Sequence, residues 1–235
     1  MGENRVIDLQ QHGDVFVLKL DRDENRFRPD FLAAIASALD EVEAAGNPAA
    51  LVTTGAGRFY SNGLDLDWMN AQDREDAASY MSSVLALFAR TLTFPAITVA
   101  AMNGHAFGAG AQWALAHDYR VMRSDRGYFC MPEINMGMPL HPGMTALIQA
   151  RLPHQSAHEV IATGKRYPAE EALGRGIVDA AVPEDQVVAQ AVELAAPLAE
   201  KAHPIMSKLK GDMYPTALER LGVDPKSVLR KDNAS

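Results

Sequence analysis

NGHAFGAGAQWALAHDYRVMRSDRGYFCMPEINMG, residues 103–137, is the stretch that decides the fold of this chain. The residues before it, 96–101, form a short apolar run that is typical of a buried strand. Three glycines then interrupt the run: Gly104, Gly108 and Gly110. Residues 111–116 favour a helix, so the N–H groups near Ala109 are expected at a helix N-terminus, unpaired and electropositive. Such a turn can hold an oxyanion, although glycine turns also serve close packing and this spacing is not the dinucleotide fingerprint.

One carboxylate of this stretch, Glu133, is expected to face away from open water. It lies among Met131, Ile134 and Met136. Desolvation in apolar surroundings raises the pKa of a carboxyl group, and a raised pKa suits a general base near neutral pH. Taken without further context, Glu133 also fits an ordinary turn.

The stretch resembles the central part of the crotonase (enoyl-CoA hydratase/isomerase) superfamily. That family has a glycine-rich N-G-x-A-x-G-G-G turn, a helix, C/H-D and then P-E-x-x-x-G. Residues 59–66, FYSNGLDL, are similar to its F-x-x-G-x-D-L loop, and residues 163–179, TGKRYPAEEALGRGIVD, resemble its later T-G and G-L-V-D signature. Three ordered motifs are far more specific than one, and they cover the chain from roughly residue 5 to residue 210. Residues 116–127, AHDYRVMRSDRG, are most similar to the plant-type Δ3,Δ2-enoyl-CoA isomerases.

The resemblance implies an α/β fold, a crotonase-like spiral of ββα units followed by C-terminal helices. Residues 1–195 would form the spiral core. Residues 196–235 would form a helical segment that packs at the site and at an oligomer interface. The implied assembly is a homotrimer or a dimer of trimers.

The resemblance also assigns the parts of an active site. Glu133 would be the catalytic base, and the N–H groups of Leu64 and Ala109 would bind the thioester oxygen. Ala109 departs from the usual glycine, but an N–H donor needs no particular side chain if the backbone angles suit alanine. Further residues that would contact substrate or CoA are Arg22, Asn25, Arg26, Asn62, Gly63, Asp65, Gly108, Gln112 and His141.

Some of these positions have a plainer interpretation. The loop with Arg22, Asn25 and Arg26 corresponds to the family loop beside the CoA adenine and ribose, and a solvated charged loop is the alternative. Asp65 corresponds to a structural aspartate of the family, which favours loop bracing over a metal site. His141 is a candidate second acid or base.

The nature of residue 112 decides the expected reaction. Hydratases of the family carry a glutamate there, and this chain has Gln112. An amide cannot exchange a proton near neutral pH, so Glu133 is left as the single carboxylate at the matched positions. One base suffices to shift a double bond from C3 to C2 of an enoyl-CoA, so isomerisation is predicted. The alternatives are another crotonase reaction (hydration, hydrolysis or decarboxylation), with Gln112 or His141 placing water, and a non-catalytic acyl-CoA-binding protein.

Composition excludes several other classes of function. The 235 residues are 48% hydrophobic and carry a net charge of −8 without a basic run, which speaks against nucleic acid as a partner. A single cysteine, Cys130, cannot form an internal disulfide. No membrane-spanning stretch or signal pattern is found, so a cytoplasmic location is expected. No metal site is expected, since His154 and His158 lack a carboxylate partner, and no cofactor beyond the CoA of the substrate.

Periodicity predicts the other elements. A hairpin is expected at 6–9 and 15–20, a helix from Pro29, a strand at 50–54 and a strand at 177–182. Further helices are expected at 73–88, 144–152, 186–198 and 201–213. In the last of these, Ser207, Lys208 and Lys210 are placed to meet CoA phosphates or solvent.

Overall fold

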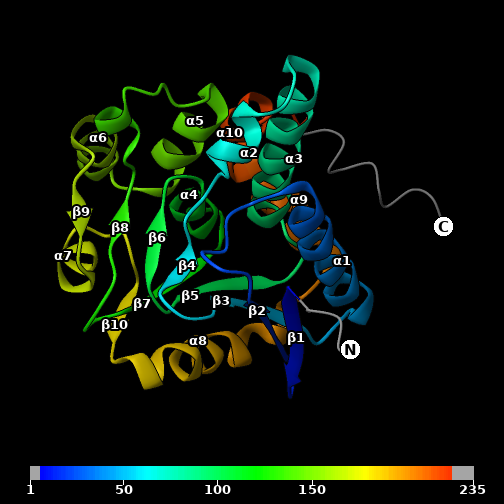
Figure 1. Ribbon diagram of the computed structural model, residues 1–235. Helices are drawn as coiled ribbons and strands as arrows, with labels where there is room; N and C mark the ends of the chain where they lie inside the picture. The colour runs from blue at the N-terminus through cyan, green and yellow to red at the C-terminus, as the bar shows by residue number, and fades with distance from the viewer. Residues whose placement is uncertain (1–5, 224–235) are drawn as a thin grey trace, which may run out of the picture.

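The computed structural model describes residues 6–223, which form an α/β fold built on two sheets (Figure 1). The larger sheet has the strand order β1-β2-β3-β5-β7-β10. Its strands are β1 (Ile7–His12), β2 (Val15–Leu20), β3 (Ala50–Gly55), β5 (Ile97–Met102), β7 (Tyr119–Arg123) and β10 (Ala180–Val182). The smaller sheet has the order β4-β6-β8-β9, with β4 (Phe59–Ser61), β6 (His105–Phe107), β8 (Phe129–Cys130) and β9 (Arg166–Tyr167). The predicted α/β class is confirmed.

The larger sheet begins with the predicted hairpin and continues in parallel. β1 and β2 pair antiparallel from Ile7 opposite Leu20 to His12 opposite Val15. All later neighbours in this sheet pair in parallel. β10 begins three residues later than predicted, because the N–H groups of residues 177 and 178 both donate to the carbonyl of Ala172 instead of joining the sheet.

A strand, strand, helix unit repeats along the chain, as the ββα spiral requires. β3 leads to β4 and then to α2 (Leu66–Asn70) and α3 (Arg74–Leu92). β5 leads to β6 and α4 (Ala109–Ala116), and β7 leads to β8, η1 (Glu133–Met136) and α5 (Pro142–Arg151). Because β4, β6 and β8 are parallel neighbours, the loops that follow them emerge at one edge of the smaller sheet. This edge is where the candidate site lies.

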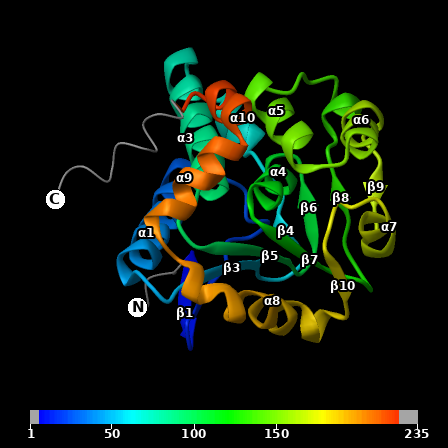
Figure 2. The ribbon, with the colours of Figure 1, turned by 180° about the vertical axis from the view of Figure 1, so that it is seen from behind.

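Helices cover both faces of the larger sheet. The remaining helical segments are α1 (Pro29–Ala45), α6 (His154–Thr163), α7 (Ala169–Gly174), η2 (Glu184–Gln186), α8 (Val187–Ala195), η3 (Ala196–Lys201), α9 (Pro204–Met213) and α10 (Pro215–Arg220). α8 runs along one face of the sheet, and the α1, α3 and α4 helices lie on the other side (Figures 1 and 2). No helix within residues 6–223 carries an apolar stretch long enough to cross a bilayer.

Trp113 of α4 sits at the centre of the main core. Its ring stacks on Tyr60 and meets Phe27 and His117 edge-on, with ring centroids 5.1–5.9 Å apart. Every residue of α4 is buried. This explains why residues 111–116 show helix-forming composition without an amphipathic pattern, since a helix that is apolar all round belongs inside the protein.

Three predicted helix boundaries need correction, and the first is that of α3, which extends to Leu92 beyond the expected end at residue 88. The helix expected at 186–198 ends at Ala195 and continues as the 3-10 segment η3, because Pro197 cannot continue an α-helix. The helix expected at 201–213 begins at Pro204, which is favoured at the first helical position.

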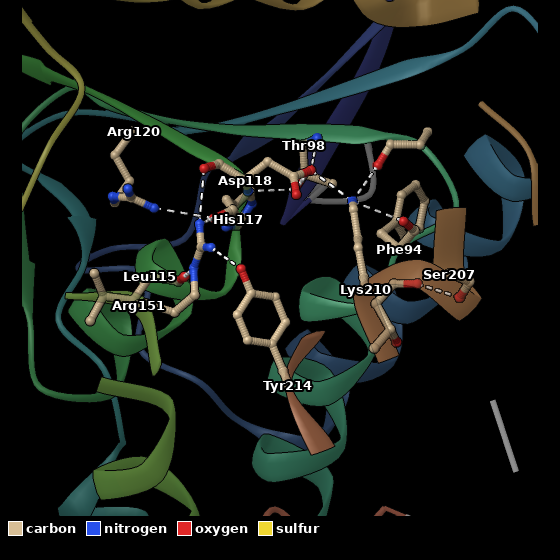
Figure 3. Close-up of polar contacts among 12 residues, drawn as sticks. Phe94, Thr98, Leu115, His117, Asp118, Arg120, Arg151, Ser207, Lys210 and Tyr214 are labelled. Carbon is tan, nitrogen blue, oxygen red and sulfur yellow. Dashed lines mark hydrogen bonds and ion pairs between the residues drawn. The ribbon is translucent and has the colours of Figure 1, made fainter. Parts of the chain in front are cut away.

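The C-terminal helices are held to the core by a buried polar network (Figure 3). Lys210 of α9 is buried, and its ammonium group donates to the carbonyls of Phe94 and Ala96 at 3.0 and 2.9 Å and to Asp118 Oδ2 at 2.7 Å. Ser207 Oγ donates to the carbonyl of Thr93. The prediction that Lys210 meets CoA phosphates or solvent is therefore wrong, because its ammonium group is buried and bonded inside the fold, whereas Ser207 is half-buried.

Arg151 of α5 adds a second tie in the same network. Its guanidinium group donates to the carbonyls of Leu115, His117 and Asp118 and to the hydroxyl group of Tyr214 (Figure 3). Through Arg151, α5 is thus bonded both to the corner after α4 and to Tyr214 at the start of α10.

Candidate active site

A mostly apolar cavity of about 300 Å³ opens at the edge of the smaller sheet. It is lined by the loop after β4, the turn between β6 and α4, and the start of η1. Leu64, Ala109 and Glu133, the three residues predicted to be catalytic, all line it. The three loops meet there because their strands are adjacent in the sheet.

Two backbone N–H groups at this cavity have no acceptor within residues 6–223. Ala109 is the first residue of α4, so its N–H has no partner inside the helix. The N–H of Leu64 likewise donates to none of the described residues. Because Ala109 has a helical backbone, alanine in place of the usual glycine brings no strain.

Gly63 allows the two donor loops to approach each other. It has a φ of +78°, and a β-carbon there would lie 2.8 Å from both Ala109 N and Phe107 O. Gly108, with a φ of +50°, occupies the N-cap position of α4. Both positions therefore need glycine, for backbone conformation and, at Gly63, for space as well.

The carboxyl group of Glu133 lies beside this turn. A β-carbon added at Gly108 would be 3.5 Å from Glu133 Oε1. Burial raises the pKa of Glu133, and smaller effects of hydrogen bonds from its own backbone and from Gln112 lower it. A carboxyl group with a raised pKa, next to two free N–H donors, can act as a base on a carbon acid whose oxygen the donors bind.

Gln112 is the side chain that contacts this base. It is fully buried in α4, and its Nε2 donates to Glu133 Oε1 at 3.0 Å. Gln112 Oε1 and Glu133 Oε2 are buried and have no hydrogen-bond partner among the described residues. The sequence placed Gln112 at the site, and the structure shows that it touches the carboxylate.

The sequence model of the family described as enoyl-CoA hydratase/isomerase matches residues 10–223. The chain belongs to the enoyl-CoA hydratase/isomerase family. Enoyl-CoA delta isomerase 2, peroxisomal, of Arabidopsis thaliana is 37% identical over 228 residues, which cover 92% of this chain and 95% of that relative. The putative enoyl-CoA hydratase of Thermus thermophilus is 32% identical over 221 residues, 91% of this chain and 85% of that protein.

The fold agrees with this membership. A probable enoyl-CoA hydratase from Mycobacterium tuberculosis superposes with a TM-score of 0.85 at 23% identity, covering 97% of this chain and 96% of that chain. The protein is therefore a crotonase-family enzyme that acts on acyl-CoA.

The loop of this crotonase that precedes α1 divides into bracing and cavity-lining residues. Asn25 is fully buried with a φ of +52°, and its side chain accepts from the N–H of Arg22 and donates to the carbonyls of residues 59 and 60. Its predicted contact with CoA is not supported, because its amide is bonded to the backbone of its own fold. Arg22 pairs with Asp30 at 2.7 Å.

Arg26 is the residue of this loop that reaches the apolar cavity, together with Asn62. Both bond to Glu24, at 2.7 and 2.8 Å. Hydrogen bonds from Arg26 and then Asn62 lower the pKa of Glu24, which keeps this carboxylate ionised. Arg26 also lines a second cavity, of about 270 Å³, together with Arg22 and Asp65. A charged cavity thus adjoins the apolar one.

Asp65 braces the Leu64 loop. Its carboxylate accepts from the N–H of Trp68 at 3.0 Å, which caps α2, and from Arg28 Nε at 2.6 Å. This geometry supports the bracing interpretation. Both carboxylate oxygens of Asp65 already accept a hydrogen bond, although the residue borders the charged cavity.

His141 does not reach the apolar cavity. Its Nδ1 accepts from the N–H of Gly143 at 3.1 Å and caps α5. The candidate second acid or base therefore stands at a helix start and is absent from the cavity lining. Within residues 6–223, no cluster of three or more histidine, cysteine or acidic side chains is able to hold a metal ion.

Sequence reasoning missed the support for the Leu64 loop. Tyr80 of α3 donates its hydroxyl to the carbonyl of Phe27 at 2.8 Å and accepts from the N–H of Asp65 at 3.2 Å. The sequence placed Met136 beside Glu133, but it assigned neither Met136 nor Met138 to the cavity lining where the structure has them. No local signal identifies either set, because both roles arise from contacts between distant segments.

Proposed function

We propose that this enzyme is a Δ3,Δ2-enoyl-CoA isomerase, which shifts the double bond of an enoyl-CoA from C3 to C2. The observation that carries the proposal is one carboxylate, Glu133, in a cavity that also presents the free N–H groups of Leu64 and Ala109. The relatives named enoyl-CoA delta isomerases in Arabidopsis thaliana, two of them 37% identical, support the same reaction.

The reaction follows from these three groups. The thioester oxygen accepts hydrogen bonds from the Leu64 and Ala109 N–H groups, each worth roughly 3–4 kcal/mol when negative charge develops on that oxygen. Glu133 removes a proton from C2, and the electron pair spreads over a dienolate. The same carboxyl group then returns the proton to C4, so the base is regenerated and no other reactant is needed.

Hydration requires a second acid, and neither of the two candidates for it, Gln112 and His141, fits that role. Gln112 contacts Glu133 with an amide, which neither gains nor loses a proton near neutral pH. His141 caps a helix elsewhere. Hydration, hydrolysis and decarboxylation therefore rank below isomerisation, and a non-catalytic role does not explain why a carboxylate is buried at the donors.

The charged cavity supports a position for the CoA end of the substrate. It adjoins the apolar cavity through the shared Arg26, and its three arginines, Arg22, Arg26 and Arg28, are each paired with an acidic side chain. Arginine side chains suit phosphate groups, because their N–H donors match phosphate oxygens in pairs. In this arrangement the acyl chain occupies the apolar cavity beside Met136 and Met138.

Turnover of 3-hexenoyl-CoA with identification of the product tests the proposal. The wild type should form 2-hexenoyl-CoA and little 3-hydroxyhexanoyl-CoA. Glu133→Gln should abolish turnover while acyl-CoA binding, measured by calorimetry, stays nearly unchanged. Near-wild-type kcat in Glu133→Gln would show that Glu133 is not the base.

We also propose a homotrimer or a dimer of trimers. Support comes from α9, where Ile205, Leu209 and Met213 repeat at a spacing of four residues and are 52–66% exposed. An apolar stripe of this kind is typical of an interface. Light scattering on the purified protein measures the mass directly, and a monomer would refute the proposal. The cytoplasmic location stays a prediction.

A further inference from the structure

We propose that Gln112 is the positioning residue for Glu133. Its side-chain amide holds the Glu133 carboxylate through a donor that cannot exchange protons. The proton taken from C2 of the substrate therefore stays on Glu133 until it is returned to C4. This inference rests on the proposed isomerisation. It assigns to Gln112 a role in catalysis that acts through its contact with Glu133.

One helix sets the distance between the base and the oxyanion donors. Ala109 and Gln112 are three residues apart in α4, so they lie on the same face one turn apart. Ala109 presents its N–H to the cavity, and Gln112 presents its Nε2 to Glu133 Oε1 at 3.0 Å. Because α4 is buried along its whole length, neither group can shift without repacking the core. Gln112 thus links the carboxyl group of η1 to the same rigid helix that carries the oxyanion donor.

The hydrogen bond survives both states of the base. Oε1 accepts from Nε2 when Glu133 is a carboxylate, and it still accepts as the carbonyl oxygen of the acid if the proton is on Oε2. The C2–H bond breaks as the O–H bond forms, and the O–H bond breaks as the C4–H bond forms. One amide orientation therefore serves the complete cycle.

Among the described residues, no titratable side chain forms a hydrogen bond with the carboxyl group of Glu133. Two groups in its neighbourhood are the Cys130 thiol, which donates to the carbonyl of Gly164, and Arg26, which lines the same cavity. Burial, with a smaller effect of Glu133, raises the pKa of Cys130 to about 11, so this thiol stays protonated, and the guanidinium of Arg26 is paired with Glu24. Neither group forms a hydrogen bond with Glu133 in the described part of the chain, and Gln112 carries no exchangeable acid.

The test compares Gln112→Met, which keeps the length of the side chain without its donor, with Gln112→Glu, which adds an exchangeable acid. Difference infrared spectra against Glu133→Gln follow the titration of the Glu133 carboxyl group without any turnover. Gln112→Met should titrate at higher pH than the wild type, since the hydrogen bond that lowers the pKa is lost. With substrate, its kcat should fall roughly tenfold to a hundredfold while KM stays within about threefold.

Isotope transfer tests the retention of the proton. With 3-hexenoyl-CoA deuterated at C2, the wild type in ordinary water should carry most of the label to C4. Gln112→Glu should release more of it to solvent. Leu115→Met, a buried substitution on the same helix, should leave the titration, kcat and label transfer unchanged. Gln112→Asn, which shortens the amide, replaces Gln112→Met if that variant does not fold.

Two results would overturn the proposal. The first is a Glu133 titration and kcat in Gln112→Met equal to those of the wild type, which would make Gln112 a core residue only. The second is complete loss of label to solvent in the wild type. If the wild type fails to turn over 3-enoyl-CoA, the proposed function fails instead, and the infrared titration still decides whether Gln112 positions Glu133.

Discussion

Replacing Lys210 by methionine should destabilise the protein strongly. The ammonium group is buried and makes three hydrogen bonds, at 3.0, 2.9 and 2.7 Å, to the Phe94 carbonyl, the Ala96 carbonyl and Asp118 Oδ2. Removing one partner of a buried ion pair costs roughly 3–5 kcal/mol, because the other charge stays buried without compensation. Methionine keeps most of the aliphatic stem, so the cost reflects the lost charge and donors.

The lower end of this range is expected, because Asp118 Oδ2 keeps two donors. The N–H and Oγ1 of Thr98 still bond to it at 2.8 and 3.0 Å. A loss of about 3 kcal/mol in a chain of this size lowers the melting temperature by roughly 6–12 °C. Urea denaturation followed by circular dichroism and calorimetric melting measure both quantities.

Lys208 provides the matched control on the same helix. It is exposed, so Lys208→Met should change the free energy of unfolding by less than about 0.5 kcal/mol. A loss below about 1 kcal/mol in Lys210→Met, or an equal loss in both variants, would refute the idea that this ion pair anchors the C-terminal helices.

Three further predictions concern the active site. Ala109→Pro removes one donor at a first helical position, where proline is tolerated, and should lower kcat roughly a hundredfold; a loss below about tenfold in a folded variant would place the oxyanion site elsewhere. Gln112→Glu restores a second carboxyl group and should raise 3-hydroxyacyl-CoA formation from 2-enoyl-CoA, whereas efficient hydration by the wild type would contradict the single-base mechanism. Because burial raises the pKa of Glu133, the folded wild type binds this proton more tightly than the unfolded chain and loses stability as pH rises through the folded pKa. The Glu133→Gln variant should therefore gain stability relative to the wild type as pH rises above about 4, the ordinary pKa of a glutamate, and denaturation curves that keep a constant gap would count against a buried carboxylate.

Local patterns in the sequence were sufficient for most of the elements and for the order of the site motifs. The β1–β2 hairpin, α1 from Pro29 and the strand before Gly104 all follow from periodicity and turn residues. The turn at Gly108 could be placed because a glycine cluster between an apolar run and a helix has few structural solutions. Glu133 was predicted in apolar surroundings and its carboxyl group is buried at the cavity, but of the neighbours that suggested this only Met131 is buried, whereas Ile134 and Met136 are exposed.

The direction of several polar side chains was decided by tertiary structure. Asn25 bonds to carbonyls 34 and 35 residues away, and Lys210 pairs with Asp118 across 92 residues. The sequence around His141 is compatible with a position at the cavity, but in the structure its side chain caps α5. Each of these groups satisfies its hydrogen-bonding capacity with whichever partner the packed core presents, and a buried polar group left unpaired is costly.

The contact between Gln112 and Glu133 depends on both the sequence and the tertiary structure. The sequence alone determined that one matched position carries an amide and the other a carboxylate, and from this it predicted a single base. Only the tertiary structure brought Gln112 Nε2 within 3.0 Å of Glu133 Oε1, 21 residues apart in the chain. Periodicity reports the face on which a residue lies, whereas the approach of two side chains depends on how α4 and η1 pack after the smaller sheet has formed.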